Sequence, residues 1–208
     1  MGRLDTVKHF ALAALIIIGA LTRGVEARAQ TQETLIVAGG CFWCVESDFE
    51  SVKGVTEAVS GYIGGTTRNP TYKQVGGGGT GHYEAVKILF DPSVVSRESL
   101  LKLFIRSIDP TDAGGQFCDR GAPYRSAIFV SNKGEKALAE RIKSEAQADL
   151  GRSIVTPILD ATTFYKAEDY HQEYWDGEGQ RNPYCLAVIP PKLMKLRKSF
   201  QKYLKEDA

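Results

Sequence analysis

Net charge is nearly absent from this sequence: 26 Lys and Arg residues face 25 Asp and Glu residues, which leaves a formal charge of +1 over 208 residues. Domains that bind nucleic acid usually carry a basic excess with aromatic side chains interleaved, so this balance argues against that class. Internal repeats are also absent, and the single long apolar run lies near the N-terminus. Cysteine is sparse, with four residues. A chain of this length can bury a sizeable core, so it does not need disulfides to hold its fold.

The N-terminal apolar run has the pattern of an export signal. A basic start precedes residues 10–21, FALAALIIIGAL, and residues 27–29, ARA, form a cleavage site of the small-residue type. The run is too short for an ordinary transmembrane helix, which needs about 20 residues. We therefore predict a signal peptide over 1–29, a single mature domain over 30–208, and a periplasmic or secreted location, with membrane contact only through the signal. An uncleaved membrane anchor is the alternative.

The apolar patterns predict strands that alternate with helices. The predicted strands cover residues 34–39, 55–64, 82–90, 124–131 and 154–165. The predicted helices cover residues 41–52, 96–108, 132–151 and 190–204. The order β-α-β-β-α-β, followed by a further helix and strand, indicates an α+β fold with a ferredoxin-like two-layer core and a C-terminal extension. Two long glycine-rich loops, 64–81 and 109–123, are the places where a functional site is expected.

Residues 39–46, GGCFWCVE, place two cysteines three positions apart around two large aromatic residues. The predicted strand ends just before Cys41, so this residue is expected at the first turn of a helix. Unpaired backbone N–H groups and the helix dipole favour an anion there, so we expect a lowered pKa for the Cys41 thiol. Cys44 lies one turn further along, where this effect is weaker. Cys41 is therefore the predicted nucleophile.

Two other interpretations of the cysteine pair are a zinc site and a dithiol switch. A zinc site would need a second close pair, but Cys118 and Cys185 lie far apart, so no metal is predicted. Redox motifs of the C-x-x-C type are common, although in thioredoxin-like proteins the aromatic residue usually precedes the motif. The alternatives that stay open are a general thiol–disulfide oxidoreductase and a metal- or redox-sensing binding module.

A series of motifs resembles the A-type peptide methionine sulfoxide reductases, abbreviated MsrA, over roughly residues 34–190. The motifs are GGCFWCVE, GYIGG, NPTYKQV, TGHYEAVKILFDP, CDRGAPYRSAIF, EDYHQEYW and NPYC, in that order. The resemblance implies reduction of methionine S-sulfoxide, free or in proteins, to methionine. It also implies that no metal or organic cofactor takes part and that a thioredoxin-like protein or small dithiol regenerates the enzyme. We expect a monomer.

The chemistry of a sulfoxide agrees with the residues in these motifs. Attack at sulfur needs a thiolate, departure of the oxygen needs an acid, and the substrate methyl group needs an apolar wall, which Phe42 and Trp43 can supply. The resemblance makes Glu84 the proton donor. Strand alternation also puts Glu84 on the same face as Val86 and Ile88, so burial should raise the pKa of its carboxyl.

Further roles are implied by the resemblance alone. Tyr72 and Tyr124 match the hydroxyl groups that bind the sulfoxide oxygen, and Asp119 matches an acidic residue that helps to hold the binding site. Singly, each tyrosine is more often an ordinary surface or core residue, so these roles depend on the resemblance. His171 is interpreted as structural.

The oxidised Cys41, a sulfenic acid, must then condense with a second thiol. Cys185 matches the family's C-terminal resolving position, on a segment whose prolines are expected to break a helix. Cys44 is the alternative, but a helical pair at this spacing seldom has the geometry of a disulfide. Gly76 stands where several relatives carry another cysteine, and Cys118 receives no role. The basic C-terminal helix is expected to present a solvated face.

Overall fold

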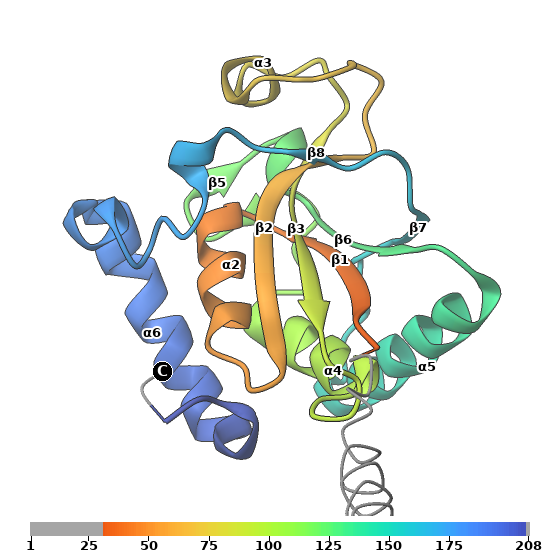
Figure 1. Ribbon diagram of the computed structural model, residues 1–208. Coiled ribbons are helices and arrows are strands. Elements are labelled where there is room, and N and C mark those ends of the chain that lie inside the picture. The colour runs from red at the N-terminus through yellow and green to blue at the C-terminus, as the bar shows by residue number, and fades with distance from the viewer. Residues whose placement is uncertain (1–30, 207–208) are drawn as a thin grey trace, which may run out of the picture. The chain divides into compact units, whose positions relative to one another are not determined.

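A computed structural model describes residues 31–206, so the predicted signal peptide lies outside the described residues. Residues Gln32–Ala208 form one compact unit built around a six-stranded sheet, in the order β7-β6-β1-β3-β2-β8 (Figure 1). The strands of this sheet are β1 (Glu33–Gly39), β2 (Val55–Ile63), β3 (Tyr83–Phe90), β6 (Ser126–Val130), β7 (Ile158–Asp160) and β8 (Tyr165–Lys166). A separate hairpin pairs β4 (Gly115–Gln116) with β5 (Asp119–Arg120).

Five α-helices lie between and after these strands in the described part of the chain. They are α2 (Phe42–Glu50), α3 (Tyr72–Gly76), α4 (Arg97–Ser107), α5 (Lys133–Leu150) and α6 (Pro183–Phe200). Short 3-10 turns lie at Ala122–Tyr124, Asp169–His171, Glu178–Arg181 and Gln201–Tyr203. The protein is thus a mixed structure of helices and a central sheet. The predicted strand over 34–39 and helices over 41–52, 96–108 and 132–151 agree with the observed elements to within three residues at each end.

Strand pairing explains how residues distant in sequence meet. β1 runs antiparallel to both β3 and β6, β2 runs antiparallel to β3, and β7 adds to β6 in parallel. In this register Tyr62 on β2 lies opposite Glu84 on β3. Since Glu84 is the second residue of β3, its side chain lies at the end of the sheet where β1 also ends.

The main hydrophobic core lies between one face of the sheet and the helices α2, α4, α5 and α6. Along β3 the residues Val86, Ile88 and Phe90 belong to this core, as strand alternation predicts. The opposite face has a smaller core around Ala85 and Phe129. Both faces of the sheet are therefore covered by apolar side chains. The buried row on β3 ends at Glu84, the predicted proton donor.

The predicted strand over 154–165 is wrong in extent, because the chain crosses the smaller core between two short strands, β7 and β8. Phe164 in this crossing segment packs closely on β2. A Cβ built on Gly61 would lie 2.4 Å from the Phe164 ring, so only glycine fits at that point of β2. Tertiary packing thus divides a segment whose β-branched pattern reads as one strand.

Helix α6 also differs from the prediction, since it starts at Pro183 and continues through Pro190 and Pro191. The Asn182 side chain caps the helix by accepting a hydrogen bond from the Tyr184 backbone N–H. Proline lacks a backbone N–H and leaves carbonyl groups one turn earlier without a helical partner. Those carbonyls belong to residues 186 and 187, which are exposed, so water can satisfy them and the helix continues.

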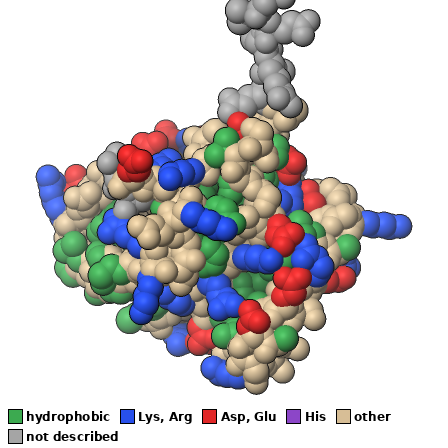
Figure 2. All heavy atoms as spheres, turned by 90° about the horizontal axis from the view of Figure 1, so that it is seen from below, with side chains coloured by type: hydrophobic (Ala, Val, Ile, Leu, Met, Phe, Trp, Pro, Cys, Tyr) green, Lys and Arg blue, Asp and Glu red, His purple; other side chains and the backbone are tan. Residues whose placement is uncertain are grey.

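The surface carries charges of both signs. Seen from below, lysine and arginine side chains alternate with acidic ones and with uncharged groups (Figure 2). Within residues 31–206, no helix is both long and apolar enough to cross a membrane.

Candidate functional site

The site begins where β1 ends and α2 starts. Gly40 has a φ of 88° and lies so close to Gln116 that an added Cβ would be 2.6 Å from the Gln116 side chain. Only glycine combines this conformation with this contact without strain. Cys41 follows as the N-terminal cap residue of α2, as predicted, and 7% of its surface stays accessible. The thiol is therefore nearly buried but not closed off.

Glu84 reaches the same point from β3. It is 1% exposed, and its Oε2 accepts a hydrogen bond of 3.1 Å from the backbone N–H of Phe42, the residue after Cys41. Its Oε1 is buried and has no hydrogen-bond partner within residues 31–206. Burial raises the pKa of the Glu84 carboxyl to about 8, although the Phe42 N–H opposes the shift. The carboxyl is thus an acid that keeps its proton near neutral pH.

The expected lowering of the Cys41 pKa is wrong for this state of the protein. The pKa of Cys41 is raised, chiefly by its hydrogen bond with Cys44 and by burial, and further by the charges of Cys44 and Glu84. The first N–H of α2, which was expected to stabilise a thiolate, is bonded to Glu84 instead. The same hydrogen bond with Cys41, together with the charge of Lys192, lowers the pKa of the Cys44 thiol despite its burial.

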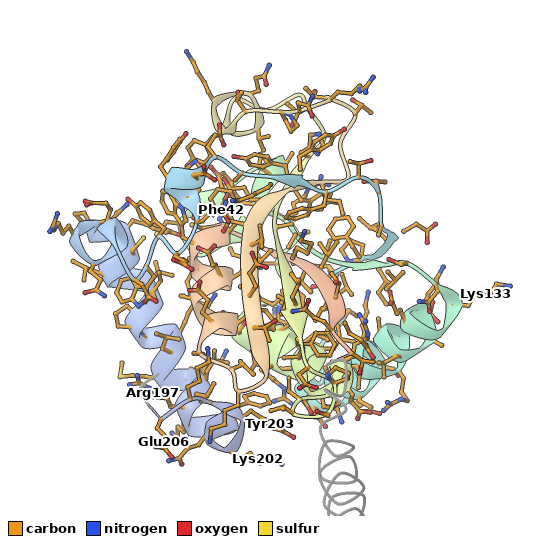
Figure 3. All side chains as sticks on the ribbon, viewed as in Figure 1. Phe42, Lys133, Arg197, Lys202, Tyr203 and Glu206 are labelled. Carbon is orange, nitrogen blue, oxygen red and sulfur yellow. The ribbon has the colours of Figure 1, made fainter. Side chains whose placement is uncertain are left out.

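Aromatic residues, Trp43, Tyr174, Trp175 and Tyr184, pack against the cluster that contains Cys41. Figure 3 labels Phe42 at the upper end of α2, where this cluster begins. The Trp43 ring stacks on Tyr174 with centroids 3.9 Å apart, and Phe42 stacks on Tyr72 at 6.0 Å. His171 lies among them, with its ring centroid 4.3 Å from that of Tyr72 and 5.1 Å from that of Phe42. Phe42 and Trp43, predicted to form the wall for the substrate methyl group, are thus part of a larger aromatic cluster.

The structure brings the other predicted residues to the same place. Tyr72 begins α3, Asp119 lies in β5, and Tyr124 ends the 3-10 turn before β6, each of them half-buried. Burial and the nearby charge of Glu84 raise the pKa of Tyr124 to about 12 and raise that of Tyr72 as well. Both hydroxyl groups therefore stay protonated and can donate hydrogen bonds.

Sequence reasoning missed several residues that complete the cluster. Glu168 accepts hydrogen bonds from the Tyr72 backbone N–H and from the Tyr62 hydroxyl, each at 2.9 Å, and so anchors the loop that carries Tyr72. Tyr184 donates a hydrogen bond to Asp119. His171 is 2% exposed, and neither of its ring nitrogens has a hydrogen-bond partner in the described part of the chain. The motif EDYHQEYW contains Glu168, His171 and Tyr174, and was the available signal for this side of the site.

Three of the four cysteines meet at the site. Cys41, Cys44 and Cys185 share a small hydrophobic cluster with Val188 and Ile189 of α6, and all are present as thiols. Cys185 is fully buried, and burial raises its pKa to about 11.

Cys118 differs from these three, because it is exposed in the turn between β4 and β5. No group of three or more His, Cys, Asp or Glu residues that could hold a metal ion occurs among residues 31–206.

Comparisons with known proteins agree with this geometry. The model of the family "Peptide methionine sulfoxide reductase" matches residues 33–204. The chain is 53% identical to "Peptide methionine sulfoxide reductase MsrA" of Erwinia tasmaniensis, over 82% of this chain and 96% of the relative. It is 50% identical to "Peptide methionine sulfoxide reductase MsrA 2" of Rhizobium meliloti, over 76% of each protein.

Solved structures give the same result. The reduced form of Mxr1 from Saccharomyces cerevisiae matches with a TM-score of 0.68 and 30% identity, over 77% of this chain and 91% of that one. A nucleophile candidate beside a neutral buried acid, the motifs around both, and these relatives lead to one conclusion. The chain belongs to the peptide methionine sulfoxide reductase family, and it is an MsrA-type enzyme that reduces methionine sulfoxide.

Proposed function

We propose that Cys41, Glu84 and the surrounding aromatic cluster reduce the S epimer of methionine sulfoxide, free or within proteins. The observation that carries this assignment is the buried carboxyl of Glu84, which holds its proton near neutral pH and accepts a hydrogen bond from the residue next to Cys41. A sulfoxide oxygen needs such an acid close to the attacking sulfur. The unpartnered Oε1 of Glu84 and Nε1 of Trp43 are further polar atoms that a bound substrate can satisfy.

The first step of the reaction transfers the sulfoxide oxygen to Cys41. The Cys41 sulfur attacks the substrate sulfur while Glu84 supplies a proton to the oxygen, with Tyr72 and Tyr124 donating hydrogen bonds to it. The oxygen transfers to Cys41, so methionine leaves and Cys41 becomes a sulfenic acid. Phe42 and Trp43 hold the methyl group through the reaction. Asp119 fixes the polar side of the site through Tyr184.

A second thiol then condenses with the sulfenic acid and releases water. Cys185 and Cys44 are both in the cluster with Cys41, so both are candidates for this step, and Cys185 is our assignment. A thioredoxin-like protein or small dithiol restores the thiols by exchange. No step calls for a metal or an organic cofactor.

Location, association and topology follow from other observations. The pattern of residues 1–29 supports export, with a mature protein from about Gln30 that acts in the periplasm or outside the cell. The monomer is a proposal that no contact in this single chain bears on. The strand order β6-β1-β3-β2, with antiparallel pairing throughout, supports assigning the core to the ferredoxin-like topology. Mass spectrometry of the exported protein tests the cleavage, and light scattering tests the monomer.

The activity is tested by mixing reduced protein with racemic methionine sulfoxide in the absence of a reductant. We expect about one methionine per chain, from the S epimer only. Cys41→Ser should abolish methionine formation, and Glu84→Gln should slow it by roughly 10²–10⁴-fold, the usual contribution of a general acid. An undiminished rate in Glu84→Gln would remove this residue from the mechanism.

The resolving thiol is tested by single substitutions of Cys185 and Cys44 to serine. The variant that lacks the resolving thiol should still form one methionine per chain and then stop at the sulfenic acid. Peptide mapping of the oxidised parent identifies the disulfide. A bridge between Cys41 and Cys44 in the final oxidised protein would contradict the assignment to Cys185. Rapid reduction of insulin disulfides without methionine formation would instead favour a general thiol–disulfide oxidoreductase.

A further inference from the structure

One large aromatic side chain beside the site is mostly exposed and has no part in the steps above. Tyr170 is 65% exposed, the highest value among the large hydrophobic side chains that lie at the surface of residues 31–206. Its ring centroid is nevertheless only 4.2 Å from that of His171. The His171 ring in turn lies 5.1 Å from Phe42 and 4.3 Å from Tyr72. The aromatic cluster of the site therefore continues through His171 to the surface, where it ends at Tyr170.

The segment that carries Tyr170 is held on both sides. Before it, Glu168 accepts a hydrogen bond of 2.9 Å from the backbone N–H of Tyr72. After it, the Gln172 side chain accepts a hydrogen bond from the backbone N–H of Ser60 and donates one to the Ser60 carbonyl, each at 3.1 Å. The Tyr170 ring is thus presented on a fixed support, so little free energy is lost in ordering the segment when a ligand packs on the ring.

Packing of the fold does not account for an aromatic ring at this position. Tyr170 belongs to none of the three hydrophobic clusters of the described chain and is not among the half-buried residues that pack on them. Single apolar side chains on a surface are ordinary and need no explanation. This one differs because it extends the predicted substrate wall, so a ligand that already occupies the wall can reach it.

A protein substrate presents more than its sulfoxide side chain to the site. Successive residues of an extended chain are about 3.4 Å apart, so the residues on either side of methionine sulfoxide lie within reach of a ring next to the wall. Free methionine sulfoxide has no such neighbours. A tyrosine ring is large, rigid and apolar except at its hydroxyl group, and it packs best on aromatic or other apolar side chains.

We propose that Tyr170 determines substrate specificity: its exposed ring binds the side chain that directly precedes or follows methionine sulfoxide in a protein, and favours an aromatic or large apolar residue there. The inference rests on the proposed function, because the sulfoxide must occupy the cluster around Phe42 and Trp43. Methionine and its apolar neighbours are usually buried in a folded protein. The preferred substrate is therefore an extended segment of an oxidised protein that has partly unfolded.

Three short peptides test this subsite on the full mature chain. Each is acetylated and amidated at its ends and has methionine S-sulfoxide at its centre. The first has only glycine on both sides, the second has phenylalanine directly before the sulfoxide, and the third has phenylalanine directly after it. A small dithiol serves as the reductant, so docking of a protein reductant does not affect the rates. Chromatography of the reduced peptide gives kcat and KM for each substrate.

We expect at least one phenylalanine peptide to exceed the glycine peptide in kcat/KM by about three- to tenfold, the usual range for an aromatic pair. The difference should lie mainly in KM, because the flanking contact is equally strong in the bound substrate and in the transition state. Tyr170→Ala should remove most of this advantage, and so should Tyr170→Gln, which keeps a long side chain without a ring. Tyr170→Phe should retain it. Phe117→Ala, which removes a ring that is 47% exposed in the turn between β4 and β5, should also retain it.

Three results would overturn the proposal. They are equal kcat/KM values for the three peptides with the parent, a phenylalanine advantage that persists when Tyr170→Ala or Tyr170→Gln is folded by circular dichroism, and an equal loss of the advantage in Phe117→Ala. Equilibrium binding of the peptides to Cys41→Ser, which cannot react, separates this inference from the proposed function. Tighter binding of a phenylalanine peptide that depends on Tyr170, with no reduction of any peptide by the parent, would support the subsite and contradict the proposed function.

Discussion

A single proton links the two central residues of the site. Glu84 has a raised pKa because it is buried, and the Cys41 thiol is held neutral by Cys44 and by the charge that Glu84 acquires on ionisation. When Glu84 is protonated, that repulsion disappears and Cys41 ionises more easily. The acid that supplies the proton therefore also controls how readily the nucleophile forms.

Glu84 should make stability depend on pH in a direction opposite to that of most carboxylates. Its pKa rises from about 4.3 in an unfolded chain to about 8 in the folded one. A raised pKa stabilises the fold fully below the unfolded value, and this contribution is lost as pH rises toward 8. Glu84→Gln should therefore increase the free energy of unfolding at pH 8 by about 2–4 kcal/mol and leave it nearly unchanged at pH 4.

Urea unfolding at both pH values measures this effect. The matched control is Glu57→Gln, which alters an exposed carboxyl on β2 and should change little at either pH. Equal effects of Glu84→Gln at pH 4 and pH 8 would show that the carboxyl is not held neutral by the fold. The variant should thus gain stability while it loses activity.

The sequence was informative about which residues meet, and less so about their ionisation. Strand alternation placed Glu84 in the core row with Val86, and the motif placed Cys41 at a helix start. The proton on Cys41 depends on Cys44 and on which group accepts the Phe42 N–H, and both are tertiary contacts. A pattern along the chain does not contain that information.

Helix α6 connects the third cysteine to the rest of the site. Its predicted start was wrong by seven residues, because two prolines read locally as helix breakers, whereas the observed helix begins at Pro183. The position of Pro183 at the first turn and the exposed carbonyls before Pro190 allow the helix to pass through them. Cys185 is therefore held in the first turn of a helix, although the prolines of its segment were expected to break one.

The Asn182 cap should fix this first turn. Asn182→Ala removes the side chain that accepts the Tyr184 N–H, and should lower the free energy of unfolding by about 1 kcal/mol. Fraying of the first turn should also make the Cys185 thiol react faster with a thiol reagent. Asn132→Ala removes the equivalent cap of α5 and should destabilise the protein similarly without affecting Cys185. Equal labelling of Cys185 in both variants would contradict this role.

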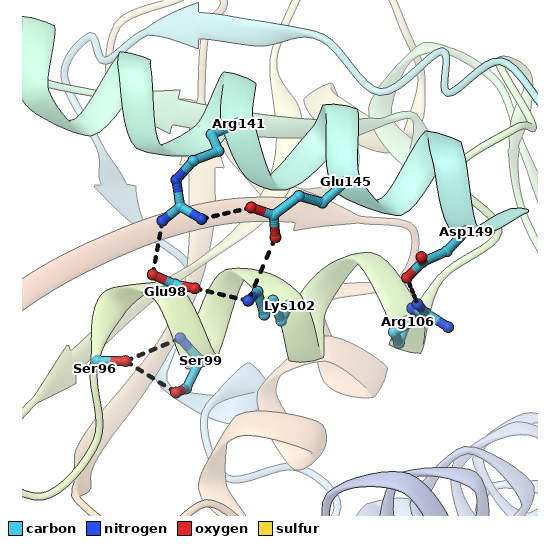
Figure 4. A network of polar contacts seen from close by, with 8 residues as sticks. All are labelled: Ser96, Glu98, Ser99, Lys102, Arg106, Arg141, Glu145 and Asp149. Atoms are coloured by element: carbon cyan, nitrogen blue, oxygen red, sulfur yellow. Dashed lines mark hydrogen bonds and ion pairs between the residues drawn. The ribbon is translucent and has the colours of Figure 1, made fainter.

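The pair α4–α5 shows a different use of charge. Glu98 contacts Lys102 and Arg141, each at 2.7 Å, and Glu145 joins the same two cations (Figure 4). The hydrogen bond from Arg141, with that from Lys102, lowers the pKa of Glu98 to about 2. Its contribution is present above the unfolded pKa of about 4.3 and is lost as pH falls toward 2. The network therefore favours the fold at neutral pH. It lies on α4 and α5, whereas the three buried cysteines lie at α2 and α6.

Across the whole molecule, the four thiols differ sharply in access. Cys118 is exposed, whereas Cys41, Cys44 and Cys185 are buried. In the reduced native protein, an aromatic disulfide reagent should modify one thiol rapidly and the other three at least about tenfold more slowly, because these need local opening. Cys118→Ser should remove the rapid phase alone. A rapid phase that persists in this variant would show that the site is more open than the structure.

The segment after β7 affects when the site is completed during synthesis of the chain. Glu168 anchors Tyr72, Tyr174 stacks on Trp43, and Tyr184 holds Asp119, so residues from the last fifth of the chain complete a centre begun at Cys41. During synthesis the sulfur appears early and its surroundings appear last. A truncated product that ends before Tyr184 would retain Cys41 and Cys44 yet lack Cys185 and the α6 residues Val188 and Ile189 that pack on them, so premature release would leave the Cys41 sulfur less protected.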